Sequence, residues 1–216
     1  MLTYRLLYAL SCLFLSCPLF SQTTIQWDQR FGGDQFEELT KIQNTSDGGF
    51  ILGGSSNSAI SGDVSEANMG QSDFWMVKTD SLGNKLWDKR FGGSGTENLQ
   101  YIEQTTDGGY ILGGWSFSDM GGDKSENNRG FPWTSDYWIV KTDALGNKVW
   151  DRTFGGSENE QLWHVEQTTD GGYIMGGWSI SGISGDKTEA NKNSSGFSFD
   201  YWVVKTDHMG IKQWDR

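Results

Sequence analysis

The stretch Trp87-Asp88-Lys89-Arg90-Phe91-Gly92-Gly93 decides the fold, because the chain repeats it. Close copies stand at residues 27–33 and 150–156, and a further copy begins at Trp214. The copies are roughly 60 residues apart, and a fixed long period indicates one supersecondary unit repeated along the chain. Each unit then needs its neighbours to cover its apolar faces. The repeat predicts an architecture, but it identifies neither a ligand nor a reaction.

One repeat contains four short segments separated by turns. In the central repeat these segments are residues 97–105, 110–116, 136–143 and 148–154. Asp107-Gly108-Gly109 signals a hairpin, since Asp-Gly and Gly-Gly accept the positive φ angles of a tight turn. No window after the first 21 residues shows helical periodicity with caps. We therefore predict four antiparallel strands. The third is apolar on both faces, and the charged fourth strand lies at an outer edge.

Four-stranded antiparallel units that bury one another are the blades of a β-propeller. We predict an all-β, propeller-like fold with about three blades, at residues 34–91, 94–154 and 157–216, and an extra outer strand at 25–31. A linear β-solenoid is the alternative, although its coils are usually shorter. Propellers close with about four to eight blades. We therefore expect an incomplete ring, a chain that continues past Arg216, and self-association through the open blade ends.

Two stretches of the central repeat resemble known propeller repeats. Residues Lys141–Trp150 resemble the hairpin of quinoprotein-like blades, which implies that the Trp docks between neighbouring blades. The wider unit, with Asp107-Gly108-Gly109-Tyr110 and Asp136-Tyr137-Trp138, resembles repeats of secreted proteins exported by type IX secretion. The resemblance covers residues 25–216, and it implies a repeat type rather than an activity.

The first 21 residues have the order of a secretory signal peptide: Arg5, an apolar run from Leu6 to Phe20, and a polar start at Ser21. The run is short for a membrane span, which needs roughly 18 apolar residues. Both cysteines, Cys12 and Cys17, lie inside it. Lipid anchoring at Cys17 is an alternative. Cleavage would leave no thiol for disulfides or zinc. From the signal peptide we expect a secreted or cell-surface protein.

The chain is acidic, with 28 Asp and Glu against 17 Lys and Arg and a net charge of −11. An acidic surface repels phosphate backbones, which disfavours nucleic acid as a partner. Cations and neutral sugars remain possible ligands, and a need for solubility alone also explains the negative net charge.

Each long loop between the second and third segments carries the same oxygen-bearing residues. They are Asp63, Glu66 and Asn68, then Asp123, Glu126 and Asn128, and finally Asp186, Glu189 and Asn191. Carboxylate and amide oxygens at short intervals suit Ca²⁺, so these nine residues are candidate calcium ligands. Turn chemistry is the alternative, because Asp and Asn favour turns without any metal. Lys124 and Lys187, beside the leading Asp, weaken the metal interpretation.

Aromatic residues interrupt the repeat near the same loops. Phe131 and Trp133 form an insertion, Phe197 lies in the third loop, and Trp115 and Trp178 replace Ser55 at a strand end. Exposed aromatic rings on a polar rim bind sugars or protein partners in many secreted proteins. The alternative is that these rings pack the loops against the blades.

Catalysis has little support, because neither His164 nor His208 has an evident partner and most carboxylates recur in every repeat. We expect a secreted binding or scaffold module that holds a glycan or a protein. The alternatives are a fragment of a polysaccharide-degrading enzyme, with a carboxylate pair completed elsewhere, and a structural surface array stiffened by calcium.

Overall fold

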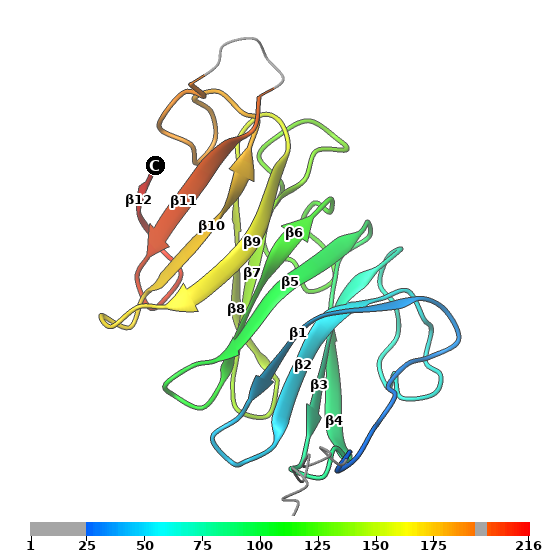
Figure 1. Ribbon diagram of the computed structural model, residues 1–216. Coiled ribbons are helices and arrows are strands. Elements are labelled where there is room, and N and C mark those ends of the chain that lie inside the picture. The colour runs from blue at the N-terminus through cyan, green and yellow to red at the C-terminus, as the bar shows by residue number, and fades with distance from the viewer. Residues whose placement is uncertain (1–24, 193–197) are drawn as a thin grey trace, which may run out of the picture.

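The computed structural model describes residues 25–192 and 198–216. The predicted signal peptide and Phe197 lie outside the described residues. Within them the chain is all-β, with three four-stranded antiparallel sheets and no helix (Figure 1). None of the sheets closes into a barrel. They follow one another like the blades of an incomplete propeller, which confirms the predicted fold class.

The strands are short and nearly identical from sheet to sheet. Sheet 1 contains β1 (Glu37–Asn44), β2 (Phe50–Ser56), β3 (Asp73–Thr79) and β4 (Lys85–Phe91). Sheet 2 contains β5 (Glu97–Gln104), β6 (Tyr110–Ser116), β7 (Asp136–Thr142) and β8 (Lys148–Phe154). Sheet 3 contains β9 (Glu160–Gln167), β10 (Tyr173–Ser179), β11 (Asp200–Thr206) and β12 (Lys212–Asp215).

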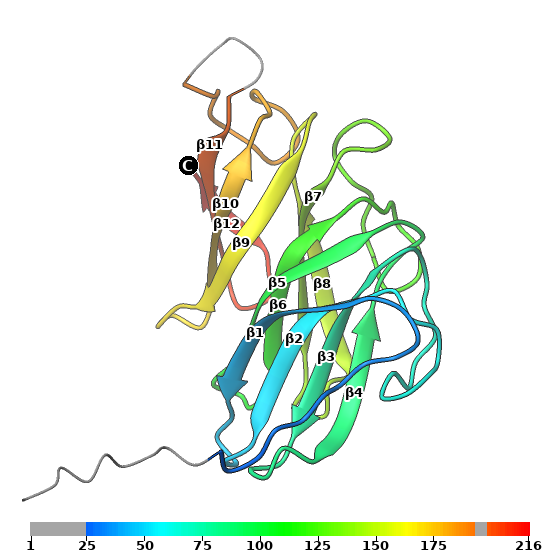
Figure 2. The ribbon, with the colours of Figure 1, turned by 45° about the vertical axis from the view of Figure 1, so that its right-hand side comes forward.

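Each sheet keeps its strands in chain order, so every connection within a sheet joins direct neighbours. The inner strands β1, β5 and β9 lie side by side, while β4, β8 and β12 are the opposite edges (Figures 1 and 2). The long connections between the second and third strands gather at one end of the sheets. We call this end the loop face: residues 57–72, 117–135, 180–192 and 198–199. The short turns lie at the other end.

The Asp-Gly-Gly turns are locked by a lysine from the third strand. In sheet 2, Gly108 has a φ of 83°, and Asp107 accepts hydrogen bonds from Thr105 Oγ1 (2.6 Å) and Gly109 N (3.0 Å). Lys141, itself buried, places Nζ 2.9 Å from Asp107 Oδ2 and donates to the carbonyl of Thr142 at 2.7 Å. The same Lys–Asp pair recurs in the other two sheets.

The two larger cores lie between sheets, and a smaller cluster of Val64, Trp75 and Val77 lies within sheet 1 and its loop. One cluster joins sheets 1 and 2, and a second joins sheets 2 and 3. At the first junction a Cβ atom on Gly53 would lie 2.6 Å from Ile102 Cγ2 and 2.9 Å from Leu99 Cδ2. Gly53 therefore leaves a hole in sheet 1 that two side chains of sheet 2 fill. All residues of β3 and β7 are buried, as predicted for a strand covered on both faces.

The repeated Trp docks between neighbouring sheets, as the resemblance to quinoprotein-like blades implies. Trp87 of β4 lies against the β7–β8 turn of sheet 2, where a Cβ atom on Gly146 would be 2.9 Å from its ring. Its ring also meets Tyr110 edge to face, with centroids 6.0 Å apart. Trp150 repeats both contacts with Gly210 and Tyr173 of sheet 3.

Two details differ from the predictions. The outer strands β4, β8 and β12 do lie at sheet edges, but their Asp residues are buried rather than exposed. Asp88 Oδ2 accepts hydrogen bonds from Trp75 Nε1 (3.0 Å) and Ser65 N (2.9 Å), because the strand turns this side chain toward the loop. Residues 25–31, predicted as an extra outer strand, pair with no sheet among the described residues. Trp27 instead packs on Phe50 and Gly83.

The glycine hole gives a direct test of the packing. Gly113 of sheet 2 faces Leu162 Cδ2 and Val165 Cγ1, which a Cβ atom would approach to 2.5 and 2.7 Å. For Gly176 of sheet 3, the nearest described atoms across from a Cβ position lie 3.8 Å away. We expect Gly113→Ala to destabilise the protein by about 1–3 kcal/mol through overpacking. Gly176→Ala should change stability by less than about 0.5 kcal/mol. Urea unfolding of both variants measures this, and equal losses would contradict the junction.

Candidate binding site

The Asp residues of the predicted calcium set join successive repeats. Each accepts a hydrogen bond from the first Gly of the preceding Phe-Gly-Gly: Asp63 from Gly32 N, Asp123 from Gly92 N and Asp186 from Gly155 N, at 3.2–3.3 Å. The backbone N–H of each Asp also donates to the carbonyl of the same Gly at 2.7–2.8 Å. These carboxylates therefore fasten each loop to the Phe-Gly-Gly segment that precedes its sheet.

The Glu and Asn residues of the set bond to other parts of the loop face. Glu66 accepts hydrogen bonds from Arg90 N (2.8 Å) and Lys89 Nζ (2.9 Å). Asn128 Nδ2 donates to the carbonyls of Ser116 and Thr134, both at 2.9 Å, and so ties together the two ends of its loop. Asn68 and Asn191 make corresponding bonds in the other loops, whereas Glu189 pairs only loosely with Arg216, at 3.7 Å.

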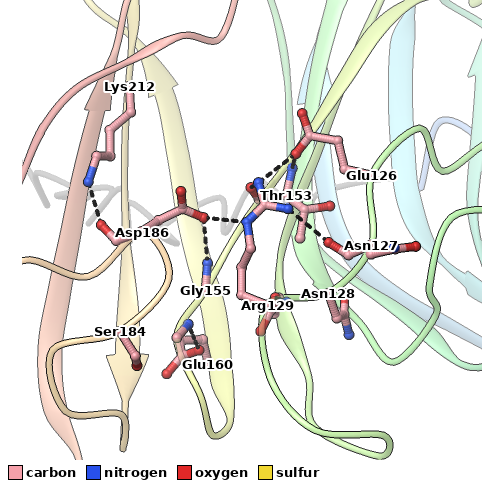
Figure 3. Close-up of polar contacts among 12 residues, drawn as sticks. Glu126, Asn127, Asn128, Arg129, Thr153, Gly155, Glu160, Ser184, Asp186 and Lys212 are labelled. Atoms are coloured by element: carbon pink, nitrogen blue, oxygen red, sulfur yellow. Dashed lines mark hydrogen bonds and ion pairs between the residues drawn. The ribbon is translucent and has the colours of Figure 1, made fainter.

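Two predicted ligands from different loops meet around an arginine. Arg129 Nε lies 2.9 Å from Asp186 Oδ2, and its Nη2 lies 2.9 Å from Glu126 Oε2 (Figure 3). The same guanidinium donates to the carbonyls of Asn127 and Thr153. Arg129 thus bridges the second and third loops of the loop face. A cation at this point would have to displace the guanidinium.

Beneath the loops, sheets 1 and 2 each bury a carboxylate at the start of the third strand, Asp73 and Asp136, near a cation. In sheet 1, Arg90 of β4 lies 3.0 Å from Asp73, with both side chains fully buried. In sheet 2 the position of Arg90 is Thr153, and Lys124 enters from the loop to donate to Thr153 Oγ1 and to the carbonyl of Glu126 at 2.9 Å. The loop lysine therefore replaces the strand arginine, which gives Lys124 a role that the sequence did not reveal.

Burial shifts the titration of these groups. It raises the pKa of Asp73 to about 6 and that of Asp136, the counterpart in sheet 2, to about 7. The backbone N–H of Arg129 opposes this shift by donating to Asp136 Oδ2 at 2.6 Å, whereas nearby Glu160 adds to it. Burial also lowers the pKa of Lys124 to about 8.

The aromatic insertion is largely exposed to solvent. Trp133 is 89% exposed and Phe131 is 68% exposed. Trp133 also has a φ of 81°, a left-handed backbone that bulky residues rarely adopt. Thr134 holds this turn by donating from both its N and its Oγ1 to the carbonyl of Phe131, at 3.1 and 2.8 Å. The structure thus presents an apolar ring outward on a fixed turn.

The other predicted aromatic residues lie apart from this insertion. Trp115 points toward sheet 3, where its ring centroid lies 5.6 Å from that of Trp163. Trp178 packs edge to face on Phe199 at 4.6 Å. The predicted residues therefore do not form one platform. Trp163 and the exposed Tyr201 were missed. Trp163 could have been noticed because the other repeats carry Thr40 and Gln100 there, whereas Tyr201 follows the repeat and gives no such signal.

Comparison with known proteins adds no assignment: no family model matches the chain, and no curated protein matches it. The described part of the chain has no helix long and apolar enough to cross a membrane. Among the residues that the structure describes, no three His, Cys, Asp or Glu side chains are grouped to hold a metal ion. Calcium binding by the nine loop residues stays a prediction.

Asp136 makes stability depend on pH. Its carboxyl stays protonated up to about pH 7 in the folded chain but ionises near its ordinary value of 3.8 in the unfolded chain. The folded state thus binds more protons between these values, so stability falls as pH rises. With about 1.4 kcal/mol per pKa unit, we expect a loss of about 2 kcal/mol from pH 5 to pH 7.5. Asp136→Asn should flatten this slope in urea unfolding, and an unchanged slope would contradict it.

Chelation separates calcium binding from turn chemistry. The loop carboxylates already accept hydrogen bonds from backbone N–H groups or pair with Lys89, Arg129 and Arg216. We therefore expect the melting temperature to be the same in EDTA as in millimolar calcium. A decrease in EDTA that calcium, but not magnesium, restores would establish the metal site instead.

Proposed function

We propose that this protein is a secreted or cell-surface binding or scaffold module, which holds a glycan or a protein partner at its loop face. The single observation that supports it most is Trp133, 89% exposed on a left-handed turn within an insertion that the other repeats lack. An exposed left-handed Trp is costly for a fold, and such strain clusters at ligand-binding sites.

The surroundings of Trp133 suit a rigid contact surface. The insertion starts at Arg129, which two carboxylates hold in place. It ends at Thr134, whose carbonyl accepts a hydrogen bond from Asn128. Phe131 adds a second exposed ring from the same turn. Flat rings of this kind bind the apolar face of a sugar or the side chains of a protein, and rigidity lowers the entropy cost of binding.

The residues that repeat in every sheet do not favour an enzyme. Glu97 Oε1 accepts from Ser116 Oγ (2.7 Å) and Ser118 Oγ (2.6 Å), and its Oε2 accepts from Gly93 N (2.8 Å). Glu160 holds the same kind of position in sheet 3. Both oxygens of these carboxylates accept hydrogen bonds that hold the loops in place, so glycoside hydrolysis would need other carboxylates. The resemblance to type IX secretion repeats agrees with an exported binding module.

Binding can be tested with one variant and one matched control. Trp133→Ala should weaken binding to glycan arrays, or to partners captured by pull-down, about tenfold, because truncating a central aromatic contact costs more than about 1 kcal/mol. Leu145→Ala removes an equally apolar, 67% exposed side chain from the opposite end of sheet 2 and should bind normally. A signal on the glycan array indicates a glycan ligand, whereas a signal in the pull-down alone indicates a protein partner. Equal binding by both variants would exclude the Trp133 surface.

A further inference from the structure

The chain uses one type of junction twice. In each case two apolar residues of an inner strand fill the glycine hole of the preceding sheet: Leu99 and Ile102 at Gly53, then Leu162 and Val165 at Gly113. All four filling side chains are fully buried. The two junctions are therefore copies of one interface, with a hole on one side and apolar side chains on the other.

Sheet 3 presents the same hole, and no side chain of the described residues fills it. No described atom across from it comes closer than 3.8 Å to a Cβ position on Gly176, the counterpart of Gly53 and Gly113. Tyr201 is 93% exposed, whereas its counterpart Tyr137 is fully buried and contacts Trp202 of the next sheet at 4.9 Å between centroids. Trp163, Trp178 and Val203 line the same open groove. We call this surface the tail face.

Sheet 1 presents the matching side chains at the other end of the chain. Leu39 and Ile42 correspond to Leu99 and Ile102, yet they are 55% and 53% exposed. They line an apolar groove with Phe50, and we call this surface the head face. The molecule thus carries both halves of its own repeated junction, each without a partner in the described chain.

Polar groups along the inner strands also match. At the internal junctions Gln43 Oε1 accepts a hydrogen bond from Gln104 N at 2.8 Å, and Glu103 Oε1 accepts one from Gln167 N at 2.5 Å. Glu166 is the next residue in this series, so its carboxylate would face Asn44 of a head face. Lys41, which lies over Tyr101 at 4.5 Å, would bring its positive charge beside Glu166. By this correspondence, docking would add one pair of opposite charges to the apolar contact.

One segment stands in the way. Trp27 lies on Gly83 as Trp87 lies on Gly146 and Trp150 on Gly210, with ring atoms 2.8–2.9 Å from the Cβ position in each case. It therefore occupies the place that Trp214 of an incoming tail face would take. Residues 27–29, which pair with no sheet among the described residues, must leave before a tail face can dock.

We propose that two copies of this chain associate head to tail, with Leu39 and Ile42 of each copy entering the Gly176 groove of the other and Trp214 replacing Trp27. Such heterologous contacts close into a ring when the rotation fits. Two copies supply six sheets, which is within the four to eight blades of closed propellers. Trp27 then acts as a cap that sets how readily the dimer forms.

Disulfide trapping tests the contact itself. A Cβ atom on Gly113 would lie 3.3 Å from Val165 Cβ, close to the spacing of disulfides. In a chain whose Cys12 and Cys17 are replaced by Ser, Gly113→Cys with Val165→Cys should give an intrachain disulfide. Gly176→Cys with Ile42→Cys, the corresponding pair, should give a covalent dimer. The single Cys variants are the controls. A monomer without a disulfide in the second pair, while the first pair forms, would overturn the proposal.

Sedimentation equilibrium tests the energetics in opposite directions. Gly176→Val fills the hole, and Ile42→Asp puts a charge into it, so each should weaken dimerisation about tenfold or more. Trp27→Ala removes the cap and should strengthen dimerisation. All three sites lie outside the buried cores, and circular dichroism confirms folding. Three outcomes would each contradict the proposed ring. The chain could have the mass of one copy at every concentration, it could form species larger than two copies, or Trp27→Ala could weaken dimerisation.

Discussion

The fold depends on a position without a side chain. Gly53 and Gly113 sit near the middle of their second strands, and the closest carbon atoms of the next sheet lie within 3 Å of where a Cβ atom would be. The sheets can therefore approach more closely than two faces of ordinary side chains would permit. Leu and Ile or Val from an inner strand then fill the space, and this contact makes each sheet bury its neighbour. The two larger apolar clusters of the described chain both lie between sheets, and a smaller one lies within sheet 1.

Much of the fold follows from the sequence because its signals are local. Alternating apolar residues and the Asp-Gly-Gly turns give strands of the central repeat that match the prediction to within one residue. The prediction of a strand at residues 25–31 was wrong for a non-local reason. The same sequence motif forms β4 and β8 because it pairs there with β3 and β7. The described chain gives residues 25–31 no such partner.

The candidate site was harder to predict because its residues depend on which way each side chain points. Trp115 looks like part of an exposed loop surface in the sequence, but its strand turns it toward Trp163 of sheet 3. The loop carboxylates look like a calcium set, yet their partners are backbone N–H groups and cations far away in the sequence. Lys124 is the clearest case. Its buried position makes sense only once Thr153 is seen to leave the space that Arg90 fills in sheet 1.

Repetition and its interruptions have different meanings in this molecule. Residues present in all three sheets, such as the Lys of the third strand and the Asp of the fourth, are bonded within the blade and leave nothing for a ligand. Residues that occur once include Trp133, Arg129 and Trp163, and these lie in solvent, between loops, or at the junction with a neighbouring sheet. A repeated fold must satisfy every copy, so only such exceptions are free to serve binding. The two end faces extend this logic, since Gly176 and Leu39 follow the repeat completely and lack a covering sheet only because none adjoins them in the described chain.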